Sequence, residues 1–107
     1  MKTAFLFPGQ GAQAVGMGGD IIHSFPAAAK IFEEANEVVG FDLGRLCIEG
    51  PHEQLNSTII SQPAIFTVSA ALLEVLRTES SAGGIQPDVT AGLSLGEYTA
   101  LYAAGVM

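Results

Sequence analysis

The chain has 107 residues, enough for one small domain, and 49% of them are hydrophobic. Eleven acidic residues against four scattered Lys and Arg give a net charge of −7 at pH 7, which excludes the clustered basic surface of a nucleic-acid-binding protein. The single cysteine, Cys47, excludes an internal disulfide and fits a reducing compartment, so we expect a buried thiol in a cytoplasmic protein.

The first predicted element is a strand at residues 4–7, a short continuous apolar run typical of a buried strand in a parallel sheet. The run ends at Pro8, short of the roughly 7–15 apolar residues of a signal peptide. No other run approaches the ~18 apolar residues that span a membrane, so we expect neither a leader nor a membrane anchor. The glycine-rich residues 8–19 are expected to form a loop.

Apolar residues recur at helical spacing over residues 25–39, which predicts an amphipathic helix. Ser24 is placed to cap its N-terminus, and Gly40 is placed to end it in a left-handed conformation. Two short helices are expected next. One covers residues 42–47 and is capped by its initial aspartate, and the other covers residues 51–55 and opens with a proline.

A long helix is expected to begin at residues 61–63 and to be buried on more than one side, because it is apolar over most of its circumference. Residues 79–87 have the composition of a loop. A second strand at residues 88–91 and a helix at residues 97–105 follow. This order predicts an α/β fold with parallel strands and flanking helices, although two strands alone do not make a stable sheet.

The segment between the second strand and the last helix is Gly-Leu-Ser-Leu-Gly, with Ser94 at its centre. The bare pattern is weak, since roughly 0.1 chance matches are expected at this composition. A strand before it and a helix after it are what a nucleophile elbow requires, with Gly92 and Gly96 allowing close backbone approach. The helix N-terminus would also favour a developing negative charge. The alternative is a serine that merely caps the helix.

A second candidate region is Phe-Pro-Gly-Gln-Gly-Ala-Gln, residues 7–13, at the carboxyl end of the first strand, where open α/β sheets bind ligands. It matches neither a P-loop nor the dinucleotide-binding pattern, which argues against nucleotide binding. A backbone N–H near Gln10 could instead join that of Leu95 as an oxyanion hole.

Three blocks, FPGQGAQAVGMG, SQPAI and GLSLGEYTALYAAG, resemble in order and spacing the N-terminal part of the malonyl-CoA:acyl carrier protein transacylases. The acyltransferase domains of fatty-acid and polyketide synthases share the pattern. The resemblance extends from residue 3 to residue 107. It implies that residues 1–107 are the N-terminal part of one acyltransferase domain, within an α/β-hydrolase-like large subdomain, ending one helix after the elbow.

The resemblance implies ping-pong acyl transfer with no metal and no cofactor beyond the substrates. Ser94 would attack malonyl-CoA, coenzyme A would leave, and the serine ester would pass its malonyl group to the phosphopantetheine thiol of acyl carrier protein. The backbone N–H groups of Gln10 and Leu95 would be the oxyanion donors. Gln62 matches a family glutamine that could order the pocket, although helix capping explains it equally well. Leu93 stands where the family usually has histidine, so that histidine's role in orienting the acyl group is absent or replaced.

A serine nucleophile needs a base, and neither His23 nor His52 is expected to supply it, because both are expected on the surface. In the family, the base and the arginine that holds the malonyl carboxylate lie downstream of the serine. Both are therefore expected beyond Met107, on the remainder of the acyltransferase chain, and this segment alone is expected to be inactive. Two alternatives remain open: a serine esterase or thioesterase with the same elbow, and a non-catalytic fragment that buries apolar faces against another polypeptide.

Overall fold

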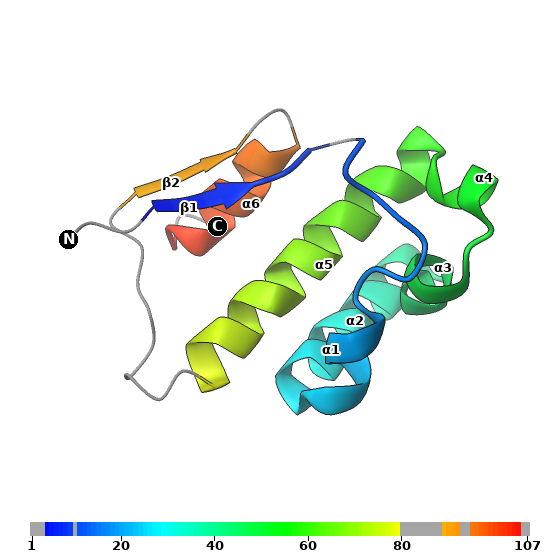
Figure 1. Cartoon of the computed structure of the whole chain (residues 1–107), viewed down its shortest axis with the longest axis horizontal. Coiled ribbons are helices and arrows are strands. Elements are labelled where there is room, and N and C mark those ends of the chain that lie inside the picture. Colours follow the sequence, from blue (N-terminus) through cyan, green and yellow to red (C-terminus); the bar gives the residue numbers. More distant parts are fainter. Residues whose placement is uncertain (1–3, 10, 80–88, 93–94, 106–107) are drawn as a thin grey trace.

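A computed structural model of the chain describes residues 4–9, 11–79, 89–92 and 95–105. Its elements follow the order β1 (Ala4–Phe7), α1 (Gly19–Ser24), α2 (Pro26–Val39), α3 (Leu43–Glu49), α4 (His52–Leu55), α5 (Thr58–Glu79), β2 (Val89–Gly92) and α6 (Gly96–Ala103). The long helix α5 runs through the middle of the molecule (Figure 1). Helices α1 to α4 lie on one side of it, and the sheet with α6 lies on the other.

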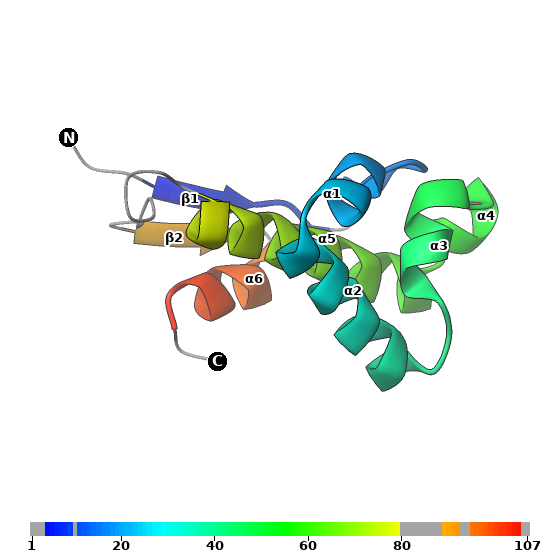
Figure 2. The same ribbon diagram turned by 90° about the horizontal axis from the view of Figure 1, so that it is seen from below.

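The sheet consists of β1 and β2, which pair in parallel with Ala4 opposite Val89 and Phe7 opposite Gly92. Helix α6 packs against both strands, below the sheet in Figure 2. The predicted α/β fold, the parallel pairing and the bounds of the first strand are therefore confirmed. The second strand and the last helix each differ from their predicted ends by one or two residues.

The burial predicted for the first strand is wrong among the described residues. Along β1 exposed and half-buried side chains alternate, and Leu6 is 77% exposed. A strand that is apolar at every position needs cover on both faces of its sheet. Here α6 packs against the sheet, and the half-buried Phe5 and Phe7, whose rings meet edge to face at 6.5 Å, alternate with the exposed Ala4 and Leu6.

The largest core cluster lies between α5 and the helices α2, α3 and α4. Its buried members are Ala28, Phe32, Leu43, Cys47, Leu55, Ala64 and Ala71. They come from all four helices, so the apolar stripe of each helix faces the others, as the predicted helical spacing requires. The core thus supports α5, and α5 in turn supports the sheet and α6.

The N-cap predicted for the helix over residues 25–39 is wrong, because Ser24 is the last residue of α1 and does not cap α2. The N-cap position belongs to Phe25, which is extended (φ −129°, ψ 117°) and donates its N–H to the Ile21 carbonyl at 3.0 Å. Pro26 follows at the first helical position, where its missing N–H costs nothing. The predicted helix end is confirmed, since Gly40 is left-handed at φ 84°.

The two short helices form where predicted. Asp42 accepts a hydrogen bond from the backbone N–H of Arg45 at 3.0 Å and so caps α3, which continues two residues past its predicted end, to Glu49. Pro51 occupies the N-cap position of α4 rather than its first turn. Each helix ends within two residues of its prediction, as expected for frayed helix ends.

Helix α5 begins at Thr58, so its predicted start at residues 61–63 is wrong. A turn of helix precedes Pro63, and the Ser61 N–H donates to the Ser57 carbonyl at 2.7 Å in this turn. Ile60 in this turn packs against the core cluster. That tertiary contact offsets the hydrogen bond that a proline cannot donate to the Ile59 carbonyl. The prediction that the long helix is buried on several sides is confirmed.

Over Thr58–Thr78, α5 is long and apolar enough to cross a membrane, with a mean hydropathy of 1.7. The sequence-based expectation counted only continuous apolar runs, which Ser61, Thr67 and Ser69 interrupt here, so it overlooked this segment. The same length and composition are typical of a core helix. All three of these polar residues are buried within the protein, and α5 packs against α2, α3, α4 and α6.

Candidate functional site

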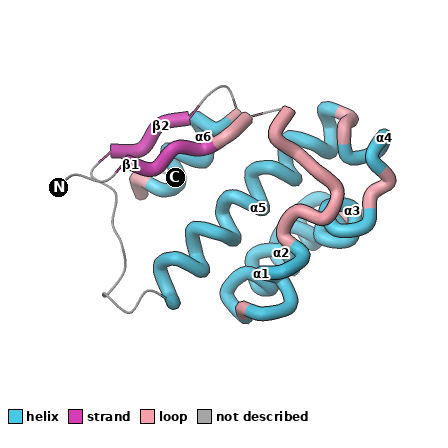
Figure 3. Tube along the Cα trace, viewed as in Figure 1, coloured by secondary structure: helices cyan, strands magenta, loops and turns pink. Residues whose placement is uncertain are grey.

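The strand predicted before the serine motif and the helix predicted after it are both present. Strand β2 ends at Gly92, opposite Phe7 at the end of β1, and α6 begins at Gly96. The carboxyl ends of both strands and the N-terminus of α6 therefore meet at one edge of the sheet (Figure 3). Leu93 and Ser94 themselves lie outside the described residues.

Neighbouring backbone atoms approach Gly92 and Gly96 so closely that neither position has room for a side chain. A Cβ added to Gly92 would overlap the Gly96 carbonyl and lie 2.6 Å from the Glu97 nitrogen. A Cβ added to Gly96 would overlap the Phe7 carbonyl and lie 3.1 Å from the Pro8 oxygen. Real Cβ contacts below about 3 Å essentially do not occur, since interiors are packed to van der Waals contact. The predicted role of both glycines in close backbone approach is confirmed.

Leu95 occupies the N-cap position of α6, and its carbonyl accepts the N–H of Tyr98 at 3.0 Å. Its own N–H belongs to the end of the helix where N–H groups have no intrahelical partner and the dipole favours negative charge. This position is compatible with the predicted oxyanion role. Gln10, the other predicted donor, lies outside the described residues.

Gln62 and Leu95 line the same cavity, of about 560 Å³, between α2, α5 and α6. Phe66, Tyr98 and Tyr102 also line it, so its walls are mostly apolar and aromatic. The structure thus brings together two predicted site residues that are far apart in the sequence. The alternative that Gln62 caps the long helix is wrong, because that helix begins four residues earlier.

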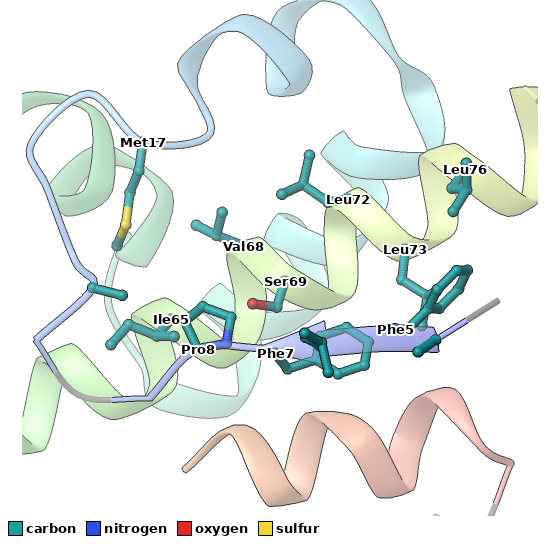
Figure 4. A pocket seen from close by; sticks show the side chains of 13 residues that line it. Phe5, Phe7, Pro8, Met17, Ile65, Val68, Ser69, Leu72, Leu73 and Leu76 are labelled. Carbon is teal, nitrogen blue, oxygen red and sulfur yellow. The ribbon is translucent and has the colours of Figure 1, made fainter. Parts of the chain in front are cut away.

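A second cavity, of about 460 Å³, lies between β1 and α5 (Figure 4). Phe5, Phe7 and Pro8 line one wall and α5 the other, with Met17 closing one end. Ser69 supplies the polar side chain among its lining residues. The cavity can therefore accommodate an apolar group, and none of its described lining residues would serve as an acid or a base.

Neither histidine nor the single cysteine lines either of these two cavities. His23 on α1 and His52 on α4 are both exposed, as predicted, and His52 Nε2 lies 2.9 Å from Asn56 Nδ2. Cys47 is fully buried, as predicted, and burial raises the pKa of its thiol to about 11. At neutral pH this thiol is protonated and is therefore a poor nucleophile.

Sequence reasoning missed a polar cluster between the end of α5 and the end of α6. The Tyr102 hydroxyl donates to Glu74 Oε1 at 2.8 Å, and Arg77 Nη1 lies 3.1 Å from the same oxygen. The signal for this cluster in the sequence was a pair of opposite charges, Glu74 and Arg77, three residues apart on an otherwise apolar helix. Their partner on α6 could not be found from the sequence, because it depends on how the two helices pack.

The acyl transferase domain family matches residues 4–107 of this chain. The malonyl CoA-acyl carrier protein transacylase of Bacillus subtilis (strain 168) is 49% identical over 106 residues, covering 99% of this chain and 32% of that protein. A crystal structure of the malonyl-CoA:ACP transacylase of Synechocystis sp. PCC 6803 is 46% identical, with a TM-score of 0.91 over 100% of this chain and 34% of that one.

A further similar structure is that of a type II PKS acyl-carrier protein in complex with its malonyl-transacylase. It has a TM-score of 0.90 and 44% identity over 98% of this chain and 33% of that one. This chain therefore spans about a third of the length of the proteins that it matches. By this match over nearly all of its residues, the chain belongs to the acyl transferase domain family.

Proposed function

We propose that this chain is the nucleophile-bearing part of a longer enzyme that transfers a malonyl group from coenzyme A to the phosphopantetheine thiol of acyl carrier protein. The observation that carries the proposal is the close backbone contact of Gly92, at the end of β2, with Gly96, at the start of α6, between which Ser94 stands in the sequence. The names of the similar proteins, which are malonyl transacylases, support the substrate class. The complex of one of them with an acyl carrier protein supports the partner.

In the proposed reaction the Ser94 hydroxyl oxygen attacks the thioester carbonyl of malonyl-CoA and passes its proton to a base. The negative charge that develops on the carbonyl oxygen is stabilised by the N–H groups of Leu95 and Gln10. Coenzyme A leaves as the thiol once it takes up that proton. In the second half the phosphopantetheine thiol attacks the serine ester, which forms malonyl–acyl carrier protein and restores the Ser94 hydroxyl.

The base and the cation for the malonyl carboxylate belong, in this proposal, to the remainder of the acyltransferase chain. Neither His23 nor His52 serves, because α1 and α4 both lie across α5 from the strand–turn–helix. The enzyme acts in the cytoplasm, where the buried Cys47 thiol stays reduced. Fatty-acid or polyketide synthesis would use its product.

The test is intact-mass spectrometry of the complete protein after incubation with malonyl-CoA. We expect a malonyl adduct that is lost in Ser94→Ala and released when phosphopantetheinylated acyl carrier protein is added. Ser57→Ala, which changes an exposed serine before α5, is the matched control and should keep the adduct. An adduct that survives Ser94→Ala would refute the assignment of the nucleophile.

The product distinguishes transfer from hydrolysis. With acyl carrier protein present, a transferase forms malonyl–acyl carrier protein faster than it releases free malonate. An esterase or thioesterase with the same elbow would release malonate at the same rate with or without the carrier. That second result would refute the proposed acceptor while leaving Ser94 as the nucleophile.

A further inference from the structure

The polar cluster at the end of α6 is built from two charges on α5 and one phenol on α6. Glu74 Oε1 accepts both the Tyr102 hydroxyl, at 2.8 Å, and Arg77 Nη1, at 3.1 Å. The side chains of Glu74 and Arg77 are 25% and 32% exposed, so solvent screens this ion pair less than a surface pair. Burial, together with the adjacent Glu74 carboxylate, raises the pKa of Tyr102, and the phenol therefore remains a donor at neutral pH.

Arg77 also holds the end of α6 directly. Its Nη2 donates to the Ala103 carbonyl at 3.0 Å, where a cation complements the negative end of the helix dipole. Its guanidinium carbon lies 5.8 Å from the centre of the Tyr102 ring. One arginine on α5 thus contacts both the last backbone turn and the aromatic side chain of α6.

The same helix is tied to the sheet from its other side. The Thr90 hydroxyl in β2 donates to the Ala100 carbonyl at 2.8 Å. Helix α6 has only eight residues, and at 1.5 Å rise per residue its two ends are roughly 10 Å apart. A short helix transmits a shift at one end to the other, so fixing the last turn of α6 also fixes Leu95 at its start.

Tyr102 connects this cluster to the cavity that Gln62 and Leu95 line. Its ring forms part of the cavity wall and meets the Phe66 ring at 5.9 Å, edge to face, while its hydroxyl points to Glu74. Loss of the hydroxyl contact would free the ring on the cavity side as well as the helix. The cluster and the candidate site therefore share a side chain.

We propose that Glu74, Arg77 and Tyr102 are positioning residues for the acyl transfer. They hold α6 so that the Leu95 N–H is aligned before the substrate arrives. This inference rests on the proposed function, because it assigns the cluster a role in the acylation of Ser94. Preorganised donors of this kind act on the rate of the chemical step rather than on substrate binding.

The test uses Glu74→Gln and Tyr102→Phe in the complete protein, since both keep the shape of the side chain. We expect the rate of Ser94 acylation to fall roughly tenfold while the KM for malonyl-CoA changes less than about twofold. The two changes should be less than additive in the double variant, because Tyr102→Phe removes the hydrogen bond that Glu74→Gln weakens by removing the charge on its acceptor. Glu49→Gln, which breaks the exposed Arg45–Glu49 pair on α3, is the matched control and should keep the wild-type rate.

Hydrogen exchange of the amides of residues 95–98 separates this inference from the proposed function. We expect these amides to exchange faster in Glu74→Gln than in Glu49→Gln, whatever the enzyme acts on. Unchanged exchange, or folded variants that acylate Ser94 at the wild-type rate, would overturn the positioning role. A wild-type protein that forms no malonyl adduct would instead refute the function, with the exchange result still valid for α6.

Discussion

The carbonyl oxygen of Phe7, at the end of β1, is packed directly against Gly96, the first residue of α6. Gly96 in turn presses its own carbonyl against Gly92 at the end of β2. The backbone segments at Phe7, Gly92 and Gly96 are therefore in contact, and neither glycine has room for a side-chain carbon. This contact fixes where α6 starts relative to both strands.

Gly96→Ala should therefore destabilise the complete protein severely, by about 3 kcal/mol or more, because backbone atoms have to move to admit the methyl group. Urea unfolding measures the change. Gly19→Ala is the matched control: its Cβ would lie 3.6 Å from the Ile48 Cγ1, an ordinary contact at the start of α1. The control should change the free energy of unfolding by no more than about 0.5 kcal/mol, and a similar small effect of Gly96→Ala would contradict the packing described here.

Two threonines near the same turn should respond in opposite ways to replacement by valine, which keeps their shape. Thr99 is fully buried, and its hydroxyl has no hydrogen-bond partner among the described residues. Thr90 donates to the Ala100 carbonyl at 2.8 Å. We expect Thr99→Val to leave the free energy of unfolding unchanged or raise it, and Thr90→Val to lower it by about 1 kcal/mol. Equal losses in both variants would show that Thr99 has a partner.

Burial of Cys47 makes stability depend on pH in the alkaline range. Its pKa is raised from 9.0 to about 11 in the folded protein, so below pH 9 the thiol is protonated in both states and its contribution is constant. Above pH 9 the unfolded chain releases this proton and the folded chain keeps it. Between pH 9 and 11 the free energy of unfolding should therefore fall by up to about 1.4 kcal/mol per pH unit.

Cys47→Ala removes this titration, so the difference between the pH profiles of the two proteins isolates it. We expect the profiles to be parallel below pH 9 and to converge above it. Parallel profiles throughout would mean that the thiol ionises as easily in the folded protein as in the unfolded one.

Much of this fold follows from local sequence, because its signals act over a few residues. Gly40 and Asp42 end and begin helices through their own backbone and side chain, and both were predicted. The N-cap predicted at Ser24 and the helix start predicted at residues 61–63 were wrong, because a helix already precedes each point, α1 before the first and residues 58–60 of α5 before the second. Where each of these helices begins depends on what Phe25 and its neighbours pack against, and no local sequence pattern contains that information.

The candidate site likewise combines features that the local sequence predicts with features that depend on how the helices pack. The flanking glycines of the serine motif and the placement of Leu95 at a helix N-terminus were accessible from the sequence, since strand, turn and helix follow one another directly. The cavity that joins Leu95 to Gln62, and the cluster around Glu74, were not, because both depend on the packing of α5 against α6.

Leu93 gives a prediction about acyl specificity, although it lies outside the described residues. We expect the complete enzyme to prefer malonyl-CoA over acetyl-CoA in spite of the leucine, because a cation elsewhere in the protein would hold the malonyl carboxylate. Direct competition between the two thioesters measures the ratio of their kcat/KM values. Leu93→His should change that ratio less than removal of the cation does, and equal kcat/KM values for both thioesters in the wild type would contradict this explanation.

Residues 1–107 alone should be neither an active transferase nor an independently stable domain. The sheet has two strands, and Leu6 on β1 and Leu72 on α5 are 77% and 50% exposed. Apolar faces of this kind are stable in water only when something covers them, and two strands do not form a stable sheet.

The chemistry of the isolated segment should fail for a separate reason, because a serine without a base reacts slowly. Its net charge of −7 would also repel an acidic carrier protein, so the docking surface is expected on the remainder of the enzyme. Expressed alone, the segment should bind a hydrophobic dye and unfold without a cooperative transition. Adding the rest of the enzyme as a separate chain should restore both a cooperative melt and malonyl transfer. A sharp melt with measurable malonyl transfer by the isolated segment would instead show that these residues already contain a complete core and a base.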